Sequence, residues 1–255
     1  MLGNLPQAMR IVQIRAENDR TKSFVLDGSL DAAPGQFVMA WLPGVDEKPF
    51  SLAYADPVIL TVAAVGPFSR ALHSLAVGDR IWLRGPLGRG YTLPSCGSSS
   101  DSVSRPHALL LGGGYGVAPL RFLAERLLAA DHTVSMIIGA RSAADLLLVD
   151  AFQAMDVPLW LTTEDGSVGL RGLATDAVEP AMAAAPTATV AVYACGPTGM
   201  LRAVAALCQA KSLPAQLSWE AHMRCSIGLC GSCEVGDGWL VCLDGPVFTS
   251  LPVSQ

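Results

Sequence analysis

The chain has 255 residues, and its 17 lysine and arginine residues against 22 aspartate and glutamate residues give a formal net charge of −5. This acidic balance excludes a protein that binds nucleic acid through bulk positive charge. Apolar residues make up 51% of the sequence and charged residues only 15%, below the roughly 25% usual in soluble domains. The composition therefore excludes a disordered chain, and the low charge favours a surface partly covered by a partner protein.

The longest apolar stretch, residues 108–120, spans 13 residues and is interrupted by four glycines. A transmembrane helix needs about 18 or more consecutive apolar residues, so we expect no membrane span. Residues 1–19 include four charged side chains and contain no apolar run of signal-peptide length. The sequence therefore predicts a cytoplasmic protein.

Residues 1–94 contain short apolar or alternating runs that are separated by Gly, Pro and Asp. This spacing is typical of strands joined by tight turns and predicts an antiparallel β-barrel with one short helix. The predicted strands cover residues 10–14, 23–26, 37–41, 50–53, 58–65 and 80–84, and the predicted helix covers residues 69–75.

Residues 95–106 are polar and rich in serine, which suits a linker between two domains. Strand-like and helix-like segments then alternate over residues 107–215, a pattern that predicts a doubly wound parallel α/β domain. The predicted strands are 107–111, 133–138, 159–163 and 189–194, and the predicted helices are 118–130, 145–155, 173–183 and 198–210. The fold class is therefore a two-domain α+β protein, with a separate C-terminal segment over residues 216–255.

Four of the seven cysteines lie within 18 residues of the C-terminal segment, spaced C-x4-C-x2-C-x8-C: Cys225, Cys230, Cys233 and Cys242. The x4 and x2 spacing is the plant-type arrangement for a [2Fe–2S] cluster. A zinc site held by four cysteines is the alternative, but such sites normally contain two short C-x2-C pairs, and this segment has one. A Rieske centre needs two histidines, and only His222 is nearby. We therefore predict that the four cysteines bind a [2Fe–2S] cluster.

A glycine-rich turn follows the first predicted strand of the α/β domain and opens its first helix. Backbone N–H groups and the helix dipole bind a pyrophosphate at this position. The pattern departs from a strict G-x-G-x-x-G, so a plain tight connection is the alternative on the pattern alone. The candidate nucleotide-binding residues here are Gly112, Gly113, Gly114, Gly116, Val117, Ala118 and Pro119.

A cation, an aromatic ring and a hydroxyl occur together in the segment Lys48, Pro49, Phe50 and Ser51. The cation and the hydroxyl suit the diphosphate of a flavin, and Phe50 can pack on a flat ring. An ordinary edge strand is the alternative explanation when the segment is taken alone.

The order of these motifs resembles the ferredoxin reductase superfamily: a barrel, a G-G-G-x-G-x-A-P turn, and C-G-P-T-G-M over residues 195–200. In that superfamily an R-x-[YF]-S segment holds the flavin, and residues 48–51 resemble it with Lys48 in place of arginine. Residues 66–69 resemble a G-x-G-[TS] flavin contact, with Phe68 in place of glycine. Residues 85–90 match the G-P-x-G-x-G element that closes the barrel. The resemblance implies that the flavin is held by Lys48, Pro49, Phe50, Ser51, Thr61, Val62, Ala63, Phe68 and Ser69.

Two further segments make the resemblance narrower. Residues 163–172 resemble a T-x-D-G-S-x-G-x-x-G element, and D-G-P-V-F follows Cys242 at residues 244–248. Together with the cysteines, these segments look like the electron-transfer subunits of NAD-dependent (class 1B) dihydroorotate dehydrogenases. In that family the segment that contains the first two cysteines usually reads C-G-x-G-x-C, and here Ser226 replaces the first glycine.

The resemblance implies FAD, a [2Fe–2S] cluster and NAD as cofactors. It also implies a heterotetramer in which two such subunits assemble with two FMN-containing dihydroorotate dehydrogenase catalytic subunits in pyrimidine biosynthesis. The nicotinamide would lie against Cys195, Gly196 and Pro197, and Cys195 would be a packing residue. No residue of the chain would need to act as a strong acid or base, because the cofactors carry out the hydride transfer.

Three questions stay open at this point. Arg141, near the end of the second strand of the α/β domain, could face the 2′-phosphate of NADP, so NAD is favoured only through the resemblance. Hydrogenases, sulfide dehydrogenases and NADPH:ferredoxin oxidoreductases contain related subunits, so the redox partner could differ. A zinc-stabilised binding module without flavin is the alternative that is not an enzyme.

Overall fold

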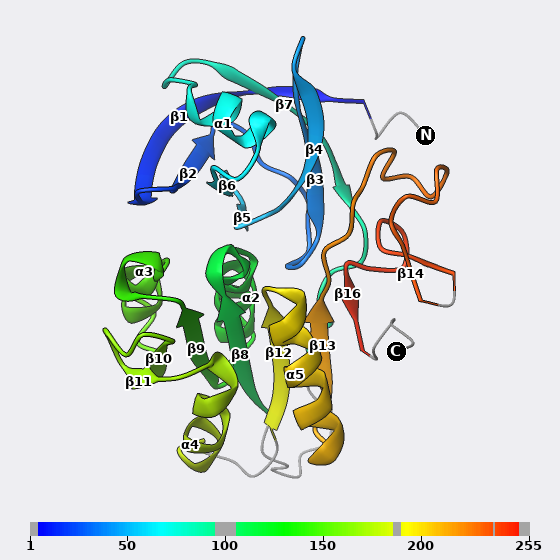
Figure 1. Ribbon diagram of the computed structural model, residues 1–255. Coiled ribbons are helices and arrows are strands. Elements are labelled where there is room, and N and C mark those ends of the chain that lie inside the picture. Colours follow the sequence, from blue (N-terminus) through cyan, green and yellow to red (C-terminus); the bar gives the residue numbers. More distant parts are fainter. Residues whose placement is uncertain (1–4, 95–105, 186–189, 237, 250–255) are drawn as a thin grey trace.

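The computed structural model describes residues 5–94, 106–185, 190–236 and 238–249, and two large sheets dominate it (Figure 1). The first sheet has seven strands in the order β4-β3-β7-β1-β2-β6-β5, and every neighbouring pair is antiparallel. Its elements are β1 (Gln7–Asn18), β2 (Thr21–Leu26), β3 (Phe37–Leu42), β4 (Asp46–Ser51), β5 (Tyr54–Ala55), β6 (Val58–Ala63), α1 (Pro67–His73) and β7 (Arg80–Leu87). The predicted antiparallel N-terminal domain is confirmed, and closure of this sheet into a barrel stays a prediction.

The core of the first sheet comes from the apolar residues that alternate along its strands. Ile11, Phe24, Val38, Leu60 and Ile81 are fully buried and pack in one cluster. Successive side chains of a strand point to opposite faces of the sheet, so the residues that alternate with these core residues face away from the core.

The second sheet has the order β11-β10-β9-β8-β12-β13-β16, and all its pairs are parallel except β13 with β16. Its strands are β8 (His107–Gly113), β9 (Val134–Ala140), β10 (Leu159–Thr163), β11 (Leu170–Arg171), β12 (Val190–Cys195), β13 (Ala215–Ser218) and β16 (Val247–Phe248). The helical elements between them are η1 (Gly114–Gly116), α2 (Val117–Ala129), η2 (Ala143–Asp145), α3 (Val149–Gln153), η3 (Ala174–Ala177), α4 (Val178–Ala183) and α5 (Thr198–Ala210).

Helices cover both faces of this second sheet. Leu109 and Leu111 of β8 pack in one core cluster with residues of η3, α4 and α5. Leu110, which points to the opposite face, packs in a second cluster with residues of α2 and α3. The prediction of a doubly wound α/β domain is therefore confirmed.

Two of the predicted helices are shorter than the sequence pattern indicated. The helix predicted over residues 145–155 is wrong in its first turn, because Leu148 has a left-handed backbone (φ 57°) and α3 begins only after it. The helix predicted over residues 173–183 is divided into η3 and α4. Pro180 lies in α4, and its missing N–H fits a place close to the start of a helix.

The C-terminal segment leaves the second sheet after β13, runs along β3 and β7 of the first sheet, and returns as β16 (Figure 1). A hairpin of β14 (Glu234–Val235) and β15 (Trp239–Leu240) lies within it. The predicted linker at residues 95–106 lies almost wholly outside the described residues, so the domain boundaries stay predictions. In the part of the chain that the structure describes, no helix is both long and apolar enough to cross a membrane.

Candidate redox site

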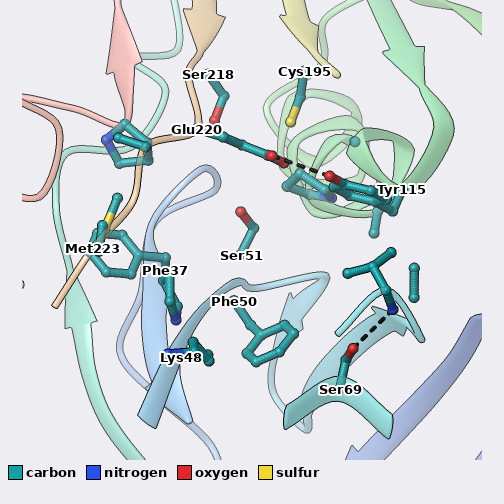
Figure 2. A pocket seen from close by; sticks show the side chains of 18 of the residues that line it. Phe37, Lys48, Phe50, Ser51, Ser69, Tyr115, Cys195, Ser218, Glu220 and Met223 are labelled. Carbon is teal, nitrogen blue, oxygen red and sulfur yellow. Dashed lines mark hydrogen bonds between the residues drawn. The ribbon is translucent and has the colours of Figure 1, made fainter. Parts of the chain in front are cut away.

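A cavity of about 410 Å³ lies where the two sheets and the C-terminal segment meet. Figure 2 shows its walls: Lys48, Phe50 and Ser51 from β4 on one side, with Tyr115 and Cys195 of the α/β domain opposite. The segment that follows β13 forms a third wall and includes Glu220 and Met223 (Figure 2). Clefts of this size between domains are where small-molecule and cofactor sites are usually found.

The wall formed by the first sheet brings together most of the predicted flavin residues. Phe50 is half-buried, and its ring lies 5.9 Å from that of Phe68, measured between centroids. Val62 differs, because its side chain is 1% exposed and packs in the core of the first sheet. The predicted flavin residues that line the cavity are Lys48, Pro49, Phe50, Ser51, Thr61, Ala63, Phe68 and Ser69.

Polar groups on this wall are partly engaged with each other. Ser69 Oγ accepts hydrogen bonds from the backbone N–H groups of Val65 (3.0 Å) and Gly66 (2.9 Å) at the start of α1. The ammonium of Lys48 pairs with the Asp46 carboxylate, and this hydrogen bond lowers the pKa of Asp46. Lys48 thus offers a cation at the mouth of the cavity, and Ser69 orders the turn that lines it.

The α/β wall is made at the ends of two neighbouring strands, β8 and β12. Gly116 comes so close to this second strand end that a Cβ on it would lie 2.4 Å from the Cys195 carbonyl oxygen. Tyr115, Gly116, Ala118, Pro119 and Cys195 line the cavity. The other predicted nucleotide residues are not among the residues that line it: Gly112, Gly113, Gly114, Val117, Gly196 and Pro197.

Those other residues nevertheless form one continuous turn region beside the cavity. A Cβ on Gly113 would meet Pro197 Cδ at 2.9 Å, and a Cβ on Gly196 would lie 3.0 Å from the backbone N of Gly113. The two glycine-containing turns therefore pack directly on each other. This is the crevice at the carboxyl ends of parallel strands where α/β sheets bind nucleotides.

Ser218 and Glu220, which the sequence analysis did not single out, also line the cavity, as does Tyr115 of the glycine-rich turn. The Tyr115 hydroxyl donates a 3.2 Å hydrogen bond to Glu220 Oε2. Loss of water around its carboxyl raises the pKa of Glu220, although the residue as a whole is exposed, and burial raises the pKa of Tyr115 to about 12. The signal that could have identified Glu220 is its place between a strand end and the first cysteine of the cluster motif.

Cys195 is 4% exposed, and burial raises the pKa of its thiol to about 12. A thiol with such a pKa is protonated at neutral pH and is a poor nucleophile. Its burial and raised pKa fit a packing residue, and its place at the nicotinamide stays a prediction.

The four motif cysteines lie in the segment between β13 and β16, and all four are free thiols. Cys225 Sγ accepts hydrogen bonds from the backbone N–H groups of Leu229 (3.3 Å) and Cys230 (3.4 Å). The thiol of Cys242 has a raised pKa, because it is buried and hydrogen-bonded to Cys233. Cys230 is exposed, whereas Cys233 and Cys242 are buried.

Backbone N–H groups directed at a cysteine sulfur fit an iron–sulfur cluster, whose thiolate ligands accept such bonds. Glycines at positive φ allow the tight turns of this loop, as at Gly228 (φ 76°) and Gly231 (φ 69°). Among the described residues, no three His, Cys, Asp or Glu side chains form a group that could hold a single metal ion.

Two families match consecutive parts of the chain. Residues 110–206 match the oxidoreductase NAD-binding domain, and residues 220–253 match the iron–sulfur cluster binding domain of dihydroorotate dehydrogenase B. A protein of Thermococcus kodakarensis named "Probable dihydroorotate dehydrogenase B (NAD(+)), electron transfer subunit" is 42% identical over 89% of this chain and 89% of its own length. The chain belongs to this family of electron-transfer subunits.

Other members of the family extend the match along the chain. A protein of Methanothermobacter thermautotrophicus with the same name is 37% identical over 99% of this chain and 92% of its own length. The family confirms the resemblance inferred from the motifs, and the chain is an NAD-linked oxidoreductase subunit with an iron–sulfur binding domain.

Solved structures agree with the fold. The structure of an NADH-dependent reduced ferredoxin-NADP oxidoreductase has a TM-score of 0.81 and 27% identity, covering 94% of this chain and 87% of the other. The FAD/NAD-binding domain of nitric oxide dioxygenase from Vibrio cholerae has a TM-score of 0.69 and 20% identity, covering 84% and 98%. At 20% identity, the match to the Vibrio cholerae domain supports the fold and nothing further.

Proposed function

We propose that this chain transfers electrons between NAD and an FMN-containing dihydroorotate dehydrogenase catalytic subunit, using FAD and a [2Fe–2S] cluster, in pyrimidine biosynthesis. One observation carries the proposal: the wall of the cavity runs directly into the cluster loop. Met223 lines the cavity, and Cys225 stands two residues later in the chain. A flavin in the cavity and a cluster on the loop would therefore be neighbours.

Each part of the chain has a separate task in this proposal. Lys48 and Ser51 offer a cation and a hydroxyl to the flavin diphosphate, and Phe50 offers a face to its ring. The turns at Gly113 and Gly196 pack on each other at the carboxyl ends of β8 and β12, where we place the nicotinamide nucleotide. Bound FAD would supply the change from hydride transfer to single-electron transfer, and this chain would orient the reactants and exclude water.

The cluster loop also presents an exposed apolar surface. Ile227, Leu229, Trp239 and Leu243 are 47–81% exposed, and the exposed Cys230 belongs to the same loop region. Apolar side chains gathered on a surface favour contact with another protein. We place the catalytic subunit on this surface, in a heterotetramer of two subunits of each kind.

A test of the proposal uses the reconstituted complex with its catalytic partner. Cys230→Ser should abolish electron transfer to the partner while leaving NADH-dependent dye reduction partly intact, because the dye takes electrons from the flavin. Cys208→Ser, in the buried face of α5, is the matched control that leaves both activities in place. Equal loss of both activities in Cys230→Ser would show that the cluster is structural.

The visible spectrum separates this function from a zinc-stabilised binding module. Anaerobically purified protein should show a flavin band with a broad iron–sulfur shoulder, and NADH should bleach both. A colourless protein that contains zinc would overturn the proposal. A cytoplasmic location also fits, because cluster assembly needs the four cysteines as free thiols.

A second candidate partner follows from the 27% identity to the ferredoxin-NADP oxidoreductase structure. In that case the same subunit would serve a different catalytic subunit, and NADPH could replace NADH. Co-purification of the tagged chain from its native cell, followed by mass spectrometry, would identify the partner.

A further inference from the structure

Arg84 of β7 joins the first sheet to the cluster loop through an unusual set of contacts. Its Nη2 donates a 3.1 Å hydrogen bond to the carbonyl oxygen of Cys225. The same guanidinium donates to both carboxylate oxygens of Glu47, at 3.1 Å from Nε and 3.0 Å from Nη2. The two side chains are only 14% and 27% exposed. A partly buried two-point pair is more rigid than the ordinary surface ion pair.

The next residue of the cluster loop is held by the neighbouring strand. Met39 of β3 pairs with Arg84 in the strand register, and its Sδ accepts a 3.0 Å hydrogen bond from Ser226 Oγ. Ser226 is 1% exposed and has a left-handed backbone (φ 54°), which a side chain adopts at a cost. Arg84 and Met39 of the first sheet thus hold Cys225 and Ser226, and Glu47 holds Arg84. We name Met39, Glu47 and Arg84 the cluster seat.

The cluster seat is continuous with the flavin side of the same sheet. Glu47 lies next to Lys48 on β4, and Lys48 lines the cavity whereas Glu47 does not. Consecutive residues of β4 thus belong to the two places, Glu47 to the seat and Lys48 to the cavity. Any movement of β4 relative to Cys225 would alter both places together.

We propose that Arg84 and Glu47 are positioning residues that fix Cys225 against the flavin domain and set the reduction potential of the cluster. The inference rests on the proposed function, because it requires the cluster on Cys225. Charge near a cluster and the hydrogen bonds of its ligands are among the factors that set its potential. Here the positive guanidinium contacts the ligand directly, and Glu47 neutralises part of its charge.

Two substitutions separate an electrostatic role from a merely structural one. Arg84→Met leaves the Glu47 carboxylate without its partner, so the cluster potential should shift to a more negative value. Glu47→Gln keeps the side-chain shape but leaves Arg84 positive, so the potential should shift to a more positive value. Simple loosening of the loop would shift both variants in the same direction.

The measurement is a redox titration of the holoprotein, following the cluster by electron paramagnetic resonance and the flavin by absorbance. Arg84→Lys keeps the charge without the two-point geometry, so its cluster potential should return toward that of the unsubstituted protein. Arg89→Gln is the control, because Arg89 also reaches the C-terminal segment, at 3.9 Å from Asp244, but is 70% exposed. It should leave the potential unchanged.

Iron and FAD contents are measured for every variant, so a failure of the proposed function is seen separately. If the unsubstituted protein and Arg89→Gln lack iron or flavin, the proposed function fails. If all variants are fully loaded and the potentials of Arg84→Met and Glu47→Gln are unchanged, or shift together, the inference is overturned. If Arg84→Met does not hold iron, Glu47→Gln decides the question alone.

Discussion

The hydroxyl of Tyr115 and the carboxylate of Glu220 are joined by a 3.2 Å hydrogen bond in the wall of the cavity between the two sheets. Tyr115 belongs to the glycine-rich turn of the α/β domain, and Glu220 belongs to the segment that leads to the cluster cysteines. The bond therefore links the predicted nicotinamide side of the cavity to the cluster side (Figure 2). Glu220 is also a carboxylate that has lost part of its water, which has a consequence for stability.

Glu220→Gln should change the pH dependence of thermal unfolding. Burial raises the pKa of Glu220 above its ordinary value of 4.5, so the folded protein binds this proton more tightly than the unfolded chain does. Its contribution to stability is thus complete below pH 4.5 and is lost as the pH rises through the raised value. Glutamine does not titrate, so the variant does not lose this contribution. The difference in melting temperature, variant minus unsubstituted protein, should therefore become more positive as the pH rises.

Tyr115→Phe is the matched variant for this experiment. The hydrogen bond from Tyr115 lowers the pKa of Glu220, so its removal should extend the loss of stability to higher pH. Melting curves from pH 5 to pH 8 for the three proteins test both statements. Parallel curves for all three would contradict the assignment.

The sequence predicted the parallel sheet well because its signals are local. Each strand of that sheet is a short apolar run, and each helix repeats its apolar residues at helical spacing. The prediction of a helix from local spacing was wrong at Leu148, whose backbone is left-handed although leucine rarely adopts that conformation. A run of three leucines at residues 146–148 reads as helix, although it forms a loop here.

The redox site could be predicted only in part, for a different reason. A short motif singled out Lys48, Phe50 and Ser51, which do line the cavity, and spacing singled out the four cysteines, whose role as cluster ligands stays a prediction. Glu220 was missed because its proximity to Tyr115 depends on how two distant segments fold together. Contacts between residues 105 positions apart leave no trace in local spacing.

Gly116→Ala should damage the nucleotide site through backbone contact. A Cβ at this position would lie 2.4 Å from the Cys195 carbonyl oxygen and 2.6 Å from the backbone N of Gly196, so the β12 turn must move. Overpacking of this kind costs about 1–3 kcal/mol of unfolding free energy. We expect this loss of stability together with weaker NADH binding, measured by chemical denaturation and by the KM for NADH.

Gly199→Ala is the control, because a Cβ there would meet no atom within 4 Å and the residue lies in α5. Alanine has the higher helix propensity, so this variant should gain up to about 1 kcal/mol. A Gly116→Ala protein as stable as Gly199→Ala would show that the close approach is not rigid.

Lys48→Met should weaken flavin binding. The ammonium of Lys48 lies at the cavity, and a hydrogen bond to a charged group contributes about 1.5–3 kcal/mol. The dissociation constant for FAD should therefore rise roughly tenfold to a hundredfold, as measured by titrating flavin-free protein with FAD. Lys48→Arg offers a two-point contact to phosphate and should bind FAD at least as tightly.

Asp46→Asn tests whether the neighbouring carboxylate competes for the same ammonium. Removing Asp46 frees Lys48 from its ion pair, so the affinity for FAD should increase slightly. If Lys48→Met and the unsubstituted protein bind FAD equally well, Lys48 does not contact the flavin diphosphate.

Cys195 should remain unmodified by iodoacetamide at pH 8 in the folded protein. Burial raises the pKa of its thiol to about 12, so only about one molecule in ten thousand carries the reactive thiolate at that pH. Cys230 provides the contrast, because it is exposed and hydrogen bonds from Ser232 and its neighbours lower the pKa of its thiol to about 6. In protein stripped of iron, mass spectrometry should find Cys230 alkylated well before Cys195.

Cys195→Ala completes this test, because loss of a packing residue lowers stability, whereas loss of a reactive residue lowers activity. Loss of the buried sulfur should cost about 1 kcal/mol of stability, while NADH-dependent dye reduction should stay within a few-fold of the unsubstituted rate. Early alkylation of Cys195 would contradict its burial, and a loss of dye reduction by orders of magnitude in Cys195→Ala with FAD still bound would show that the thiol contributes to hydride transfer. The 4% exposure of Cys195 argues for the first outcome, since the reagent and the nicotinamide must both reach the sulfur to use it.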